Sequence, residues 1–188
     1  MIICQRHKVL CQTIPKCASS SLNSFFKTYY KNHITYLRNQ EEPFTTQHIY
    51  KYREQFKDYY KFAIMRNPWD RMVSLYKNKI VDAHRYRKTS KLVRKYGFND
   101  KMTFTQFVLH LIKLDESKLD VHAQPQYKFV YCDGINVLDF IGSVENLEKD
   151  WKTICANANI RHRILRHINR GRDKVSYKYY YETILINF

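Results

Sequence analysis

Two segments of this chain share a pattern in which a short apolar run leads through a polar turn into residues with helical spacing. The first begins with the run K-V-L-C-Q-T-I at 8–14 and continues as P-K-C-A-S-S-S. Beyond the serines, apolar residues recur with the spacing of one α-helix face: Leu22, Phe25, Phe26 and Tyr29. The serines stand where this helix begins, and serine side chains readily cap the unpaired N–H groups of a helix start.

The second segment has the same layout. The apolar run Y-K-F-A-I-M at 60–65 is followed by Arg66, Asn67 and Pro68. Proline is well placed in a first helical turn, and asparagine is a good capping residue. Helical spacing then follows at Trp69, Met72, Val73 and Tyr76. Two such strand–turn–helix units predict an α/β fold with a central parallel sheet flanked by helices.

The remaining patterns fit a single domain over residues 1–188, an ordinary size for one hydrophobic core. Hydrophobic residues make up 44% of the chain, which is enough for a sizeable core. Further elements are predicted from apolar spacing: a helix at 102–114, a strand at 137–141, a helix at 145–158 and a helix from 177 onward.

Composition restricts the partners and the compartment. The net charge of +16, from 33 Lys and Arg against 17 Asp and Glu, favours polyanionic partners but also fits a merely soluble, lysine-rich protein. The five cysteines form no C-x-x-C pair, so we expect neither a disulfide framework nor a structural zinc site. Since no apolar run could span a bilayer and the N-terminus is unlike a leader, we expect a cytoplasmic protein without membrane contact. Nothing in the sequence indicates the oligomeric state.

The first turn has the chemical means to hold a phosphate or sulfate group. The first N–H groups of a helix converge on one point, where the helix dipole adds about half a positive charge. Lys16 adds a full cation, and the hydroxyls of Ser19, Ser20 and Ser21 add donors. The glycine-rich loop of nucleoside triphosphatases does not fit, because none of the four glycines lies near Lys16. A plain helix behind a strand is the alternative without a ligand.

The second turn places Arg66 where a magnesium-dependent nucleotide site would need an aspartate. A guanidinium presents a fork of donors to an oxyanion. Ser74, about two turns into the helix, could complete the cage, although its hydroxyl could instead bond back to the helix. The two turns together indicate an anion site that needs no metal.

Five segments, in order, resemble sulfotransferases that use 3′-phosphoadenosine 5′-phosphosulfate (PAPS). P-K-C-A-S-S-S resembles their 5′-phosphosulfate loop, and R-N-P-W-D-R-M-V-S-L-Y resembles their 3′-phosphate motif, an arginine followed eight residues later by a serine. Three further segments are similar: H-x-x-P-Q at 122–126, D-F-I-G-S-V-E-N-L-E-K-D-W at 139–151 and H-I-N-R at 167–170. The last resembles a late loop on the cofactor side. The likeness spans nearly the whole chain and is closest to the carbohydrate branch, especially its short soluble members.

The resemblance implies PAPS as the sulfate donor, a hydroxyl of a carbohydrate as the acceptor, and no metal. The residues that it assigns to PAPS are Pro15, Lys16, Cys17, Ala18, Ser19, Ser20 and Ser21 at the 5′-phosphosulfate, with Arg66 and Ser74 at the 3′-phosphate. The pair Ser19-Ser20 stands where the family often has Gly-Thr, so we expect a less permissive turn.

Sulfuryl transfer needs positive charge at the leaving phosphate and a base at the acceptor hydroxyl. Lys16 and the helix start can supply the charge, and histidine suits the base because its pKa lies near neutral pH. We expect His48 to be the base, since a histidine in this region has that role in some branches of the resembled family. His122, or one of the carboxylates Glu41 and Glu42, is the alternative.

Other interpretations stay open. A kinase that uses a nucleoside triphosphate would depend on magnesium, and the missing glycines count against it. A non-catalytic nucleic-acid-binding module would bind with steep salt dependence, but it does not require Arg66 and Ser74 at their spacing. An inactive relative of the family is a further possibility. The basic stretch 85–101 suits an anionic glycan as acceptor, and we expect Trp69 and Trp151 to pack in the core rather than on adenine.

Overall fold

The computed structural model describes residues 1–37, 49–50, 53–85, 96–116, 119–168 and 175–185. The chain divides into two compact units. The first comprises Met1–Asn67 and Pro125–Asn169, and the second comprises Pro68–Gln124 and Arg170–Phe188. All strands in the described ranges belong to the first unit.

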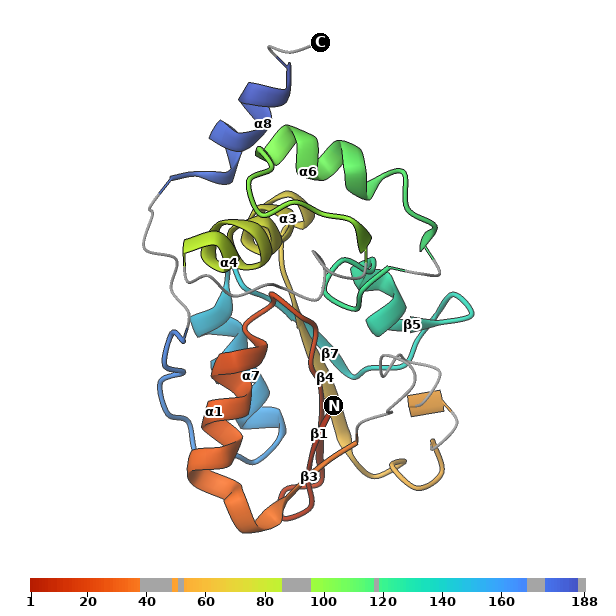
Figure 1. Ribbon diagram of the computed structural model, residues 1–188. Helices are drawn as coiled ribbons and strands as arrows, with labels where there is room; N and C mark the ends of the chain where they lie inside the picture. The colour runs from red at the N-terminus through yellow and green to blue at the C-terminus, as the bar shows by residue number, and fades with distance from the viewer. Residues whose placement is uncertain (38–48, 51–52, 86–95, 117–118, 169–174, 186–188) are drawn as a thin grey trace. The chain divides into compact units, whose positions relative to one another are not determined.

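A five-stranded sheet forms the centre of the first unit (Figure 1). Its strands lie in the order β3 (Ile34–Tyr36), β1 (Ile2–Cys4), β2 (Val9–Gln12), β4 (Tyr60–Met65) and β7 (Phe140–Ser143). The strands β2, β4 and β7 run parallel, whereas β1 pairs antiparallel with both β2 and β3. The predicted α/β fold and its parallel centre are confirmed. The whole sheet is mixed because the chain begins with a hairpin that the sequence pattern did not indicate. A separate small hairpin joins β5 (Tyr131–Cys132) and β6 (Ile135–Asn136).

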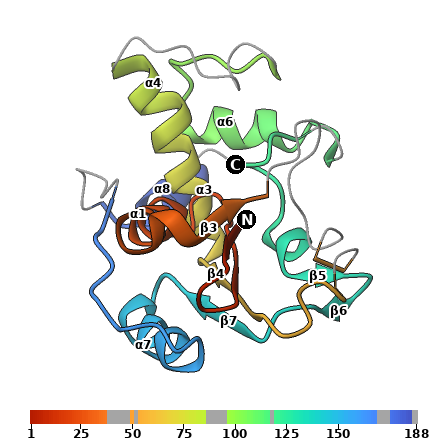
Figure 2. The same cartoon turned by 90° about the horizontal axis from the view of Figure 1, so that it is seen from below.

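Helices α1 (Ser19–Tyr30) and α7 (Leu147–Asn157) pack together on one face of this sheet (Figures 1 and 2). The rings of Phe25 and Trp151 meet edge to face, with centroids 4.8 Å apart. Trp151 is buried, as expected, and its indole N–H donates to the carbonyl of Arg163 at 2.9 Å. Burying one large apolar side chain contributes about 1.5–3 kcal/mol. This aromatic layer therefore holds α1 against the sheet and fixes where the turn before it lies.

The second unit is a group of helices around an aromatic core. Its helices are α3 (Pro68–Tyr76), the π-helical η2 (Lys77–Val81), α4 (Asp82–Arg85), α6 (Phe104–Leu111) and α8 (Tyr177–Leu185). Tyr76, Phe104 and Tyr180 contact one another through edge-on ring pairs. Helix α6 begins at a capping box, in which Thr103 and Gln106 each accept the other's backbone N–H with a side-chain oxygen.

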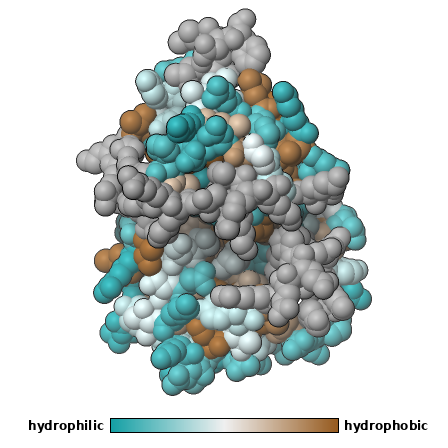
Figure 3. All heavy atoms as spheres, in the orientation of Figure 1, coloured by the Kyte–Doolittle hydropathy of each residue, from teal (hydrophilic) through white to brown (hydrophobic). Residues whose placement is uncertain are grey.

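Exposed apolar residues are scattered over the described surface. On the face seen in Figure 3 they form separate spots between hydrophilic side chains. Trp69 is 58% exposed and lies edge-on to Tyr181 at 5.0 Å, so the expectation that it packs in the core is wrong. In the ranges given above, no helix is long and apolar enough to cross a membrane.

Candidate functional site

The turn that joins β2 to α1 is left-handed at two positions that are not glycine. Lys16 has a φ of 69° and Ala18 a φ of 55°, whereas Cys17 between them has no positive φ. Left-handed backbone costs such residues about 1–2 kcal/mol each, and strain of this kind clusters at functional sites. When successive residues alternate between right-handed and left-handed backbone conformation, their N–H groups point toward one place, as in anion-binding nests. The N–H of Cys17 donates to the carbonyl of Ile14 at 3.2 Å, so the backbone offers an anion the N–H of Ala18 and those at the start of α1.

Helix α1 begins directly after this turn, at Ser19. Its N-cap residue is Ala18, and no side chain caps the helix, so the expectation of a serine cap is wrong. The three serines instead occupy the first helical turn, where backbone N–H groups have no acceptor within the helix. The hydroxyl oxygen of Ser21 accepts the N–H of Ile168 at 3.3 Å. This bond brings Ile168, the second residue of the H-I-N-R motif, to the start of the helix.

Arg66 directly follows β4, the parallel neighbour of β2, and so it lies at the same edge of the sheet as the turn. Ligands of parallel sheets bind at this carboxyl edge. The Nη1 of Arg66 donates to the carbonyl of Lys16 at 3.3 Å. A guanidinium has five N–H donors, so one such bond does not exhaust it. The structure thus brings together Lys16 and Arg66, the two cations that the sequence pattern singled out.

A buried glutamine connects the turn at 15–18 to Arg66 through hydrogen bonds. The sequence pattern assigned this residue no separate role. Gln126 is the first residue of the 3-10 helix η4 (Gln126–Phe129) and is 7% exposed. Its Oε1 accepts the N–H of Arg66 at 2.9 Å and the thiol of Cys17 at 3.1 Å. Its Nε2 donates to the carbonyl of Arg66 at 2.7 Å. The signal for this residue was its place at the end of the H-x-x-P-Q motif.

Two carboxylates from the 139–151 motif support the same edge of the sheet. The Oε1 of Glu145 accepts the N–H of Asn67 at 2.7 Å, directly after Arg66. The Oδ2 of Asp150 accepts the N–H of Ser143 at 2.7 Å, at the end of β7. Both side chains therefore accept backbone N–H groups at or just beyond the ends of the strands.

The second unit contains Ser74 and the alternative base His122. Ser74 is half-buried in α3, and its part in a 3′-phosphate site stays a prediction. The Nδ1 of His122 lies 2.6 Å from the Oδ1 of Asp120. Such a bond fixes the orientation of an imidazole and selects its tautomer. Burial raises the pKa of Asp120, but the hydrogen bonds from the ring and backbone of His122 outweigh it and leave this pKa below its usual value.

The buried Arg71 holds the segment that carries His122. Its guanidinium donates to the carbonyl of Gln124 at 2.9 Å and to the carbonyl of His122 at 3.1 Å. Arg71 thus has a structural role within the second unit, next to the Asp120–His122 pair.

The expected base His48 lies outside the described residues, as do Glu41, Glu42 and residues 86–95 of the basic stretch 85–101. Their assignments stay predictions. The five cysteines are all buried and none of them forms a disulfide, and burial raises the pKa of Cys11 and of Cys155 to about 12. Among the side chains that the structure describes, no group of three or more His, Cys, Asp or Glu could hold a metal ion.

Comparison with known proteins identifies a family. A profile of the Sulfotransferase family matches residues 1–183. Carbohydrate sulfotransferase 14 of Danio rerio is 33% identical over 109 residues, and that of Homo sapiens is 30% identical over 107 residues. Each match covers 52% of this chain but only 29% and 28% of the respective relative, so the matched part spans less than a third of those proteins. No solved structure shows a significant match.

Proposed function

Because this chain belongs to the Sulfotransferase family, we propose that it transfers a sulfuryl group from PAPS to a hydroxyl group of a carbohydrate. One observation carries the proposal: Arg66 bonds to the carbonyl of Lys16 at 3.3 Å, in a left-handed turn at a helix start. Two cations and a helix N-terminus suit a ligand with several negative charges. The carbohydrate acceptor is proposed from the two relatives, which are carbohydrate sulfotransferases.

The residues divide into groups with different tasks. Lys16 and the backbone after it would hold the 5′-phosphosulfate, with further donors from Ser19 and Ser20. Ser21 would contribute its backbone N–H and its hydroxyl proton, because the hydroxyl oxygen only accepts the N–H of Ile168 and can still donate. Arg66 would bind the 3′-phosphate together with Ser74.

PAPS supplies an activated sulfuryl group, which moves from a phosphate oxygen to the acceptor hydroxyl by in-line displacement. The leaving phosphate gains negative charge, and fixed positive groups stabilise such charge in a site shielded from water. Lys16 and the start of α1 have this role in the proposal. They supply the charge without a metal, so we expect activity in the presence of a chelator.

Two histidines are candidates for the base at the acceptor hydroxyl, beside the carboxylates Glu41 and Glu42. His48 is the first, from its place between the two nucleotide motifs. A specific contact favours His122 as the second, because Asp120 bonds to its Nδ1 at 2.6 Å and leaves Nε2 to take a proton. Substituting each histidine with alanine separates them: the base variant should lose at least about 100-fold in kcat, while the other should keep most of it.

The first test is calorimetric binding of adenosine 3′,5′-bisphosphate without magnesium, with wild type beside Arg66→Ala. We expect binding by wild type and a loss of at least about 10-fold in the variant, because an arginine–phosphate pair contributes about 1.5–3 kcal/mol. Lys57→Ala removes an exposed cation from the same unit and is the matched control. No binding by folded wild type, or binding only with a nucleoside triphosphate and magnesium, would contradict the proposal.

A further inference from the structure

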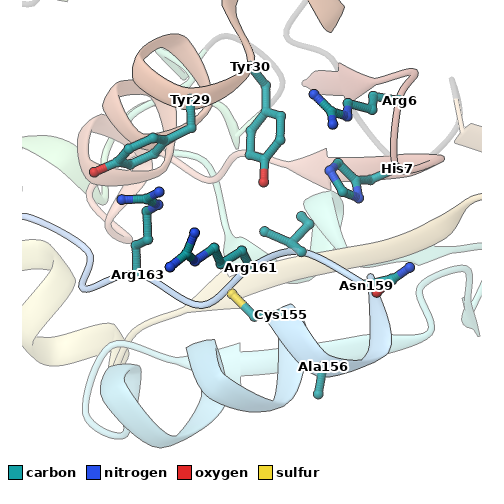
Figure 4. A pocket seen from close by; sticks show the side chains of 10 residues that line it. Arg6, His7, Tyr29, Tyr30, Cys155, Ala156, Asn159, Arg161 and Arg163 are labelled. Atoms are coloured by element: carbon teal, nitrogen blue, oxygen red, sulfur yellow. The ribbon is translucent and has the colours of Figure 1, made fainter.

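A basic pocket lies in the first unit, at the C-terminal end of α1. The turn at 15–18, which would hold the 5′-phosphosulfate and is called the PAPS turn below, lies at the other end of this helix. Its volume is about 530 Å³, within the roughly 300–1,000 Å³ typical of small-molecule sites. Its main side chains are Tyr29 and Tyr30 from α1, Arg6 and His7 from the turn between β1 and β2, and Arg161 and Arg163 from the segment after α7 (Figure 4). Since α1 has 12 residues, about 18 Å of helix separates the pocket from the PAPS turn.

No acidic side chain among the described residues neutralises the positive charge of this pocket. None of the ten lining residues is acidic, and no ion pair in the described ranges involves Arg6, Arg161 or Arg163. Burial, and then the charge of Arg6, lower the pKa of His7. Two helix C-termini lie nearby, but each contributes only about half a negative charge. Three guanidinium groups therefore leave a clear excess of positive charge.

The arginines after α7 are not needed to end that helix. Its C-terminus forms a Schellman motif, in which the N–H of Ile160 donates to the carbonyl of Cys155 at 2.8 Å. The N–H of Asn159 donates to the carbonyl of Ala156 at 3.2 Å, and Asn159 has the left-handed backbone that this motif requires, with a φ of 49°. Backbone N–H groups thus bond to the last carbonyls of α7, which in other helices often accept hydrogen bonds from cationic side chains. Arg161 and Arg163 are therefore available to bind another partner.

The walls of the pocket are held in place by the fold. The guanidinium carbon of Arg163 lies 4.6 Å from the centroid of the Tyr29 ring, and its carbonyl accepts the Trp151 N–H at 2.9 Å. The ring of His7 meets that of Tyr30 edge-on at 4.9 Å. Arginine binds sulfate and carboxylate groups through paired N–H donors. Tyrosine offers an apolar face and a hydroxyl, which suits the mixed surface of a sugar ring.

We propose that this pocket is a second binding site for a sulfated oligosaccharide, separate from the PAPS turn. The choice of a sugar rests on the proposed function, since such an enzyme handles carbohydrate chains and makes sulfate esters. A chain held here by its existing sulfates stays near the enzyme and raises the local concentration of further acceptor hydroxyls.

The test is titration calorimetry with a heparin-derived octasaccharide and its chemically desulfated counterpart, near physiological salt and with saturating adenosine 3′,5′-bisphosphate. The pocket variant is Arg6→Gln with Arg161→Gln. The matched control is Lys149→Gln with Lys152→Gln, which removes the same charge from exposed positions on α7. We expect at least a 10-fold loss of affinity for the sulfated octasaccharide in the pocket variant, less than a threefold loss in the control, and little binding of the desulfated sugar.

Equal losses in the two double variants would overturn the proposal, because they would show only general attraction between charges. Equal affinity for the sulfated and the desulfated octasaccharide would also overturn it. The same holds if a single-stranded oligonucleotide binds the pocket more tightly than the sulfated sugar. Arg66→Ala keeps this test distinct from the proposed function. That variant should lose affinity for the bisphosphate yet still bind the sulfated octasaccharide. If wild type binds the sulfated sugar but transfers no sulfate, only the proposed function is contradicted.

Discussion

Replacing Gln126 with methionine nearly keeps the volume of a buried side chain but removes three hydrogen bonds. Two of them pair the backbone N–H and carbonyl of Arg66, at 2.9 and 2.7 Å, and the third pairs the thiol of Cys17 at 3.1 Å. An unpaired buried backbone group costs about 1–3 kcal/mol. Arg66 is only half-buried, so water can reach it and the lower part of that range applies. We therefore expect Gln126→Met to lower the free energy of unfolding by about 2–4 kcal/mol.

The same change should weaken nucleotide binding beyond its effect on stability. Gln126 fixes the backbone from which the Arg66 side chain reaches the Lys16 carbonyl. Without it, the guanidinium and the turn must be ordered when the ligand binds. Ordering a long side chain costs about 0.5–1.5 kcal/mol, which corresponds to a loss of about 2- to 12-fold in affinity for adenosine 3′,5′-bisphosphate.

Urea unfolding and calorimetry measure these two effects separately. Gln106→Met is the matched control, because Gln106 also bonds to backbone through its side chain but belongs to the capping box of α6 in the second unit. It should cost about 0.5–1.5 kcal/mol of stability and leave nucleotide affinity unchanged. Affinity within twofold of wild type in folded Gln126→Met would refute the positioning role, whatever the loss of stability.

Three other changes test the surrounding fold. The native state holds the pKa of Asp120 below its usual value, so its carboxylate stabilises the fold above about pH 4 and this contribution disappears as the pH falls further. Urea unfolding should then show a stability gap between wild type and Asp120→Asn that shrinks below about pH 4, and a constant gap would contradict it. Gly142→Ala places a β-carbon 3.0 Å from the Cβ of Asp150 and should cost about 1–3 kcal/mol in thermal melts, whereas an unchanged Tm would mean that β7 shifts freely. Trp151→Phe shrinks a buried side chain and removes the donor to the Arg163 carbonyl, so it should cost about 1–3 kcal/mol of unfolding free energy; a smaller loss would mean that the neighbouring side chains fill the space.

The parts of the fold that the sequence predicted are those in which local patterns agree with tertiary packing. The apolar runs at 8–14 and 60–65 contain β2 and β4, and the helical spacing after each turn belongs to α1 and α3. The helix predicted at 145–158 is α7, with ends that differ by one or two residues. The strand predicted at 137–141 lies instead at Phe140–Ser143. The side-chain oxygen of Asn136 accepts the N–H of Leu138, and pairing with β4 begins only at Phe140.

The parts that the sequence missed depend on pairing across the chain. Strand β1 has only three residues, and its partner β3 is a further three residues more than thirty positions away. A pattern confined to one segment cannot show such pairing. Gln126 was missed for the same reason, since its partners Cys17 and Arg66 lie 109 and 60 residues away. The motifs identified the cations of the site but not the neutral side chain that holds them together.

The absence of glycine in the turn at 15–18 is consistent with an anion site once the contacts around it are considered. Left-handed backbone at Lys16 and Ala18 costs about 2–4 kcal/mol in total. Several contacts hold the turn in this form: Cys17 is buried, its N–H bonds to the carbonyl of Ile14, and its thiol bonds to Gln126. Glycines would relieve the strain but would also let the free turn sample other forms. A turn held by its surroundings keeps the N–H of Ala18 and those at the start of α1 in place before an anion arrives, so less ordering is required on binding.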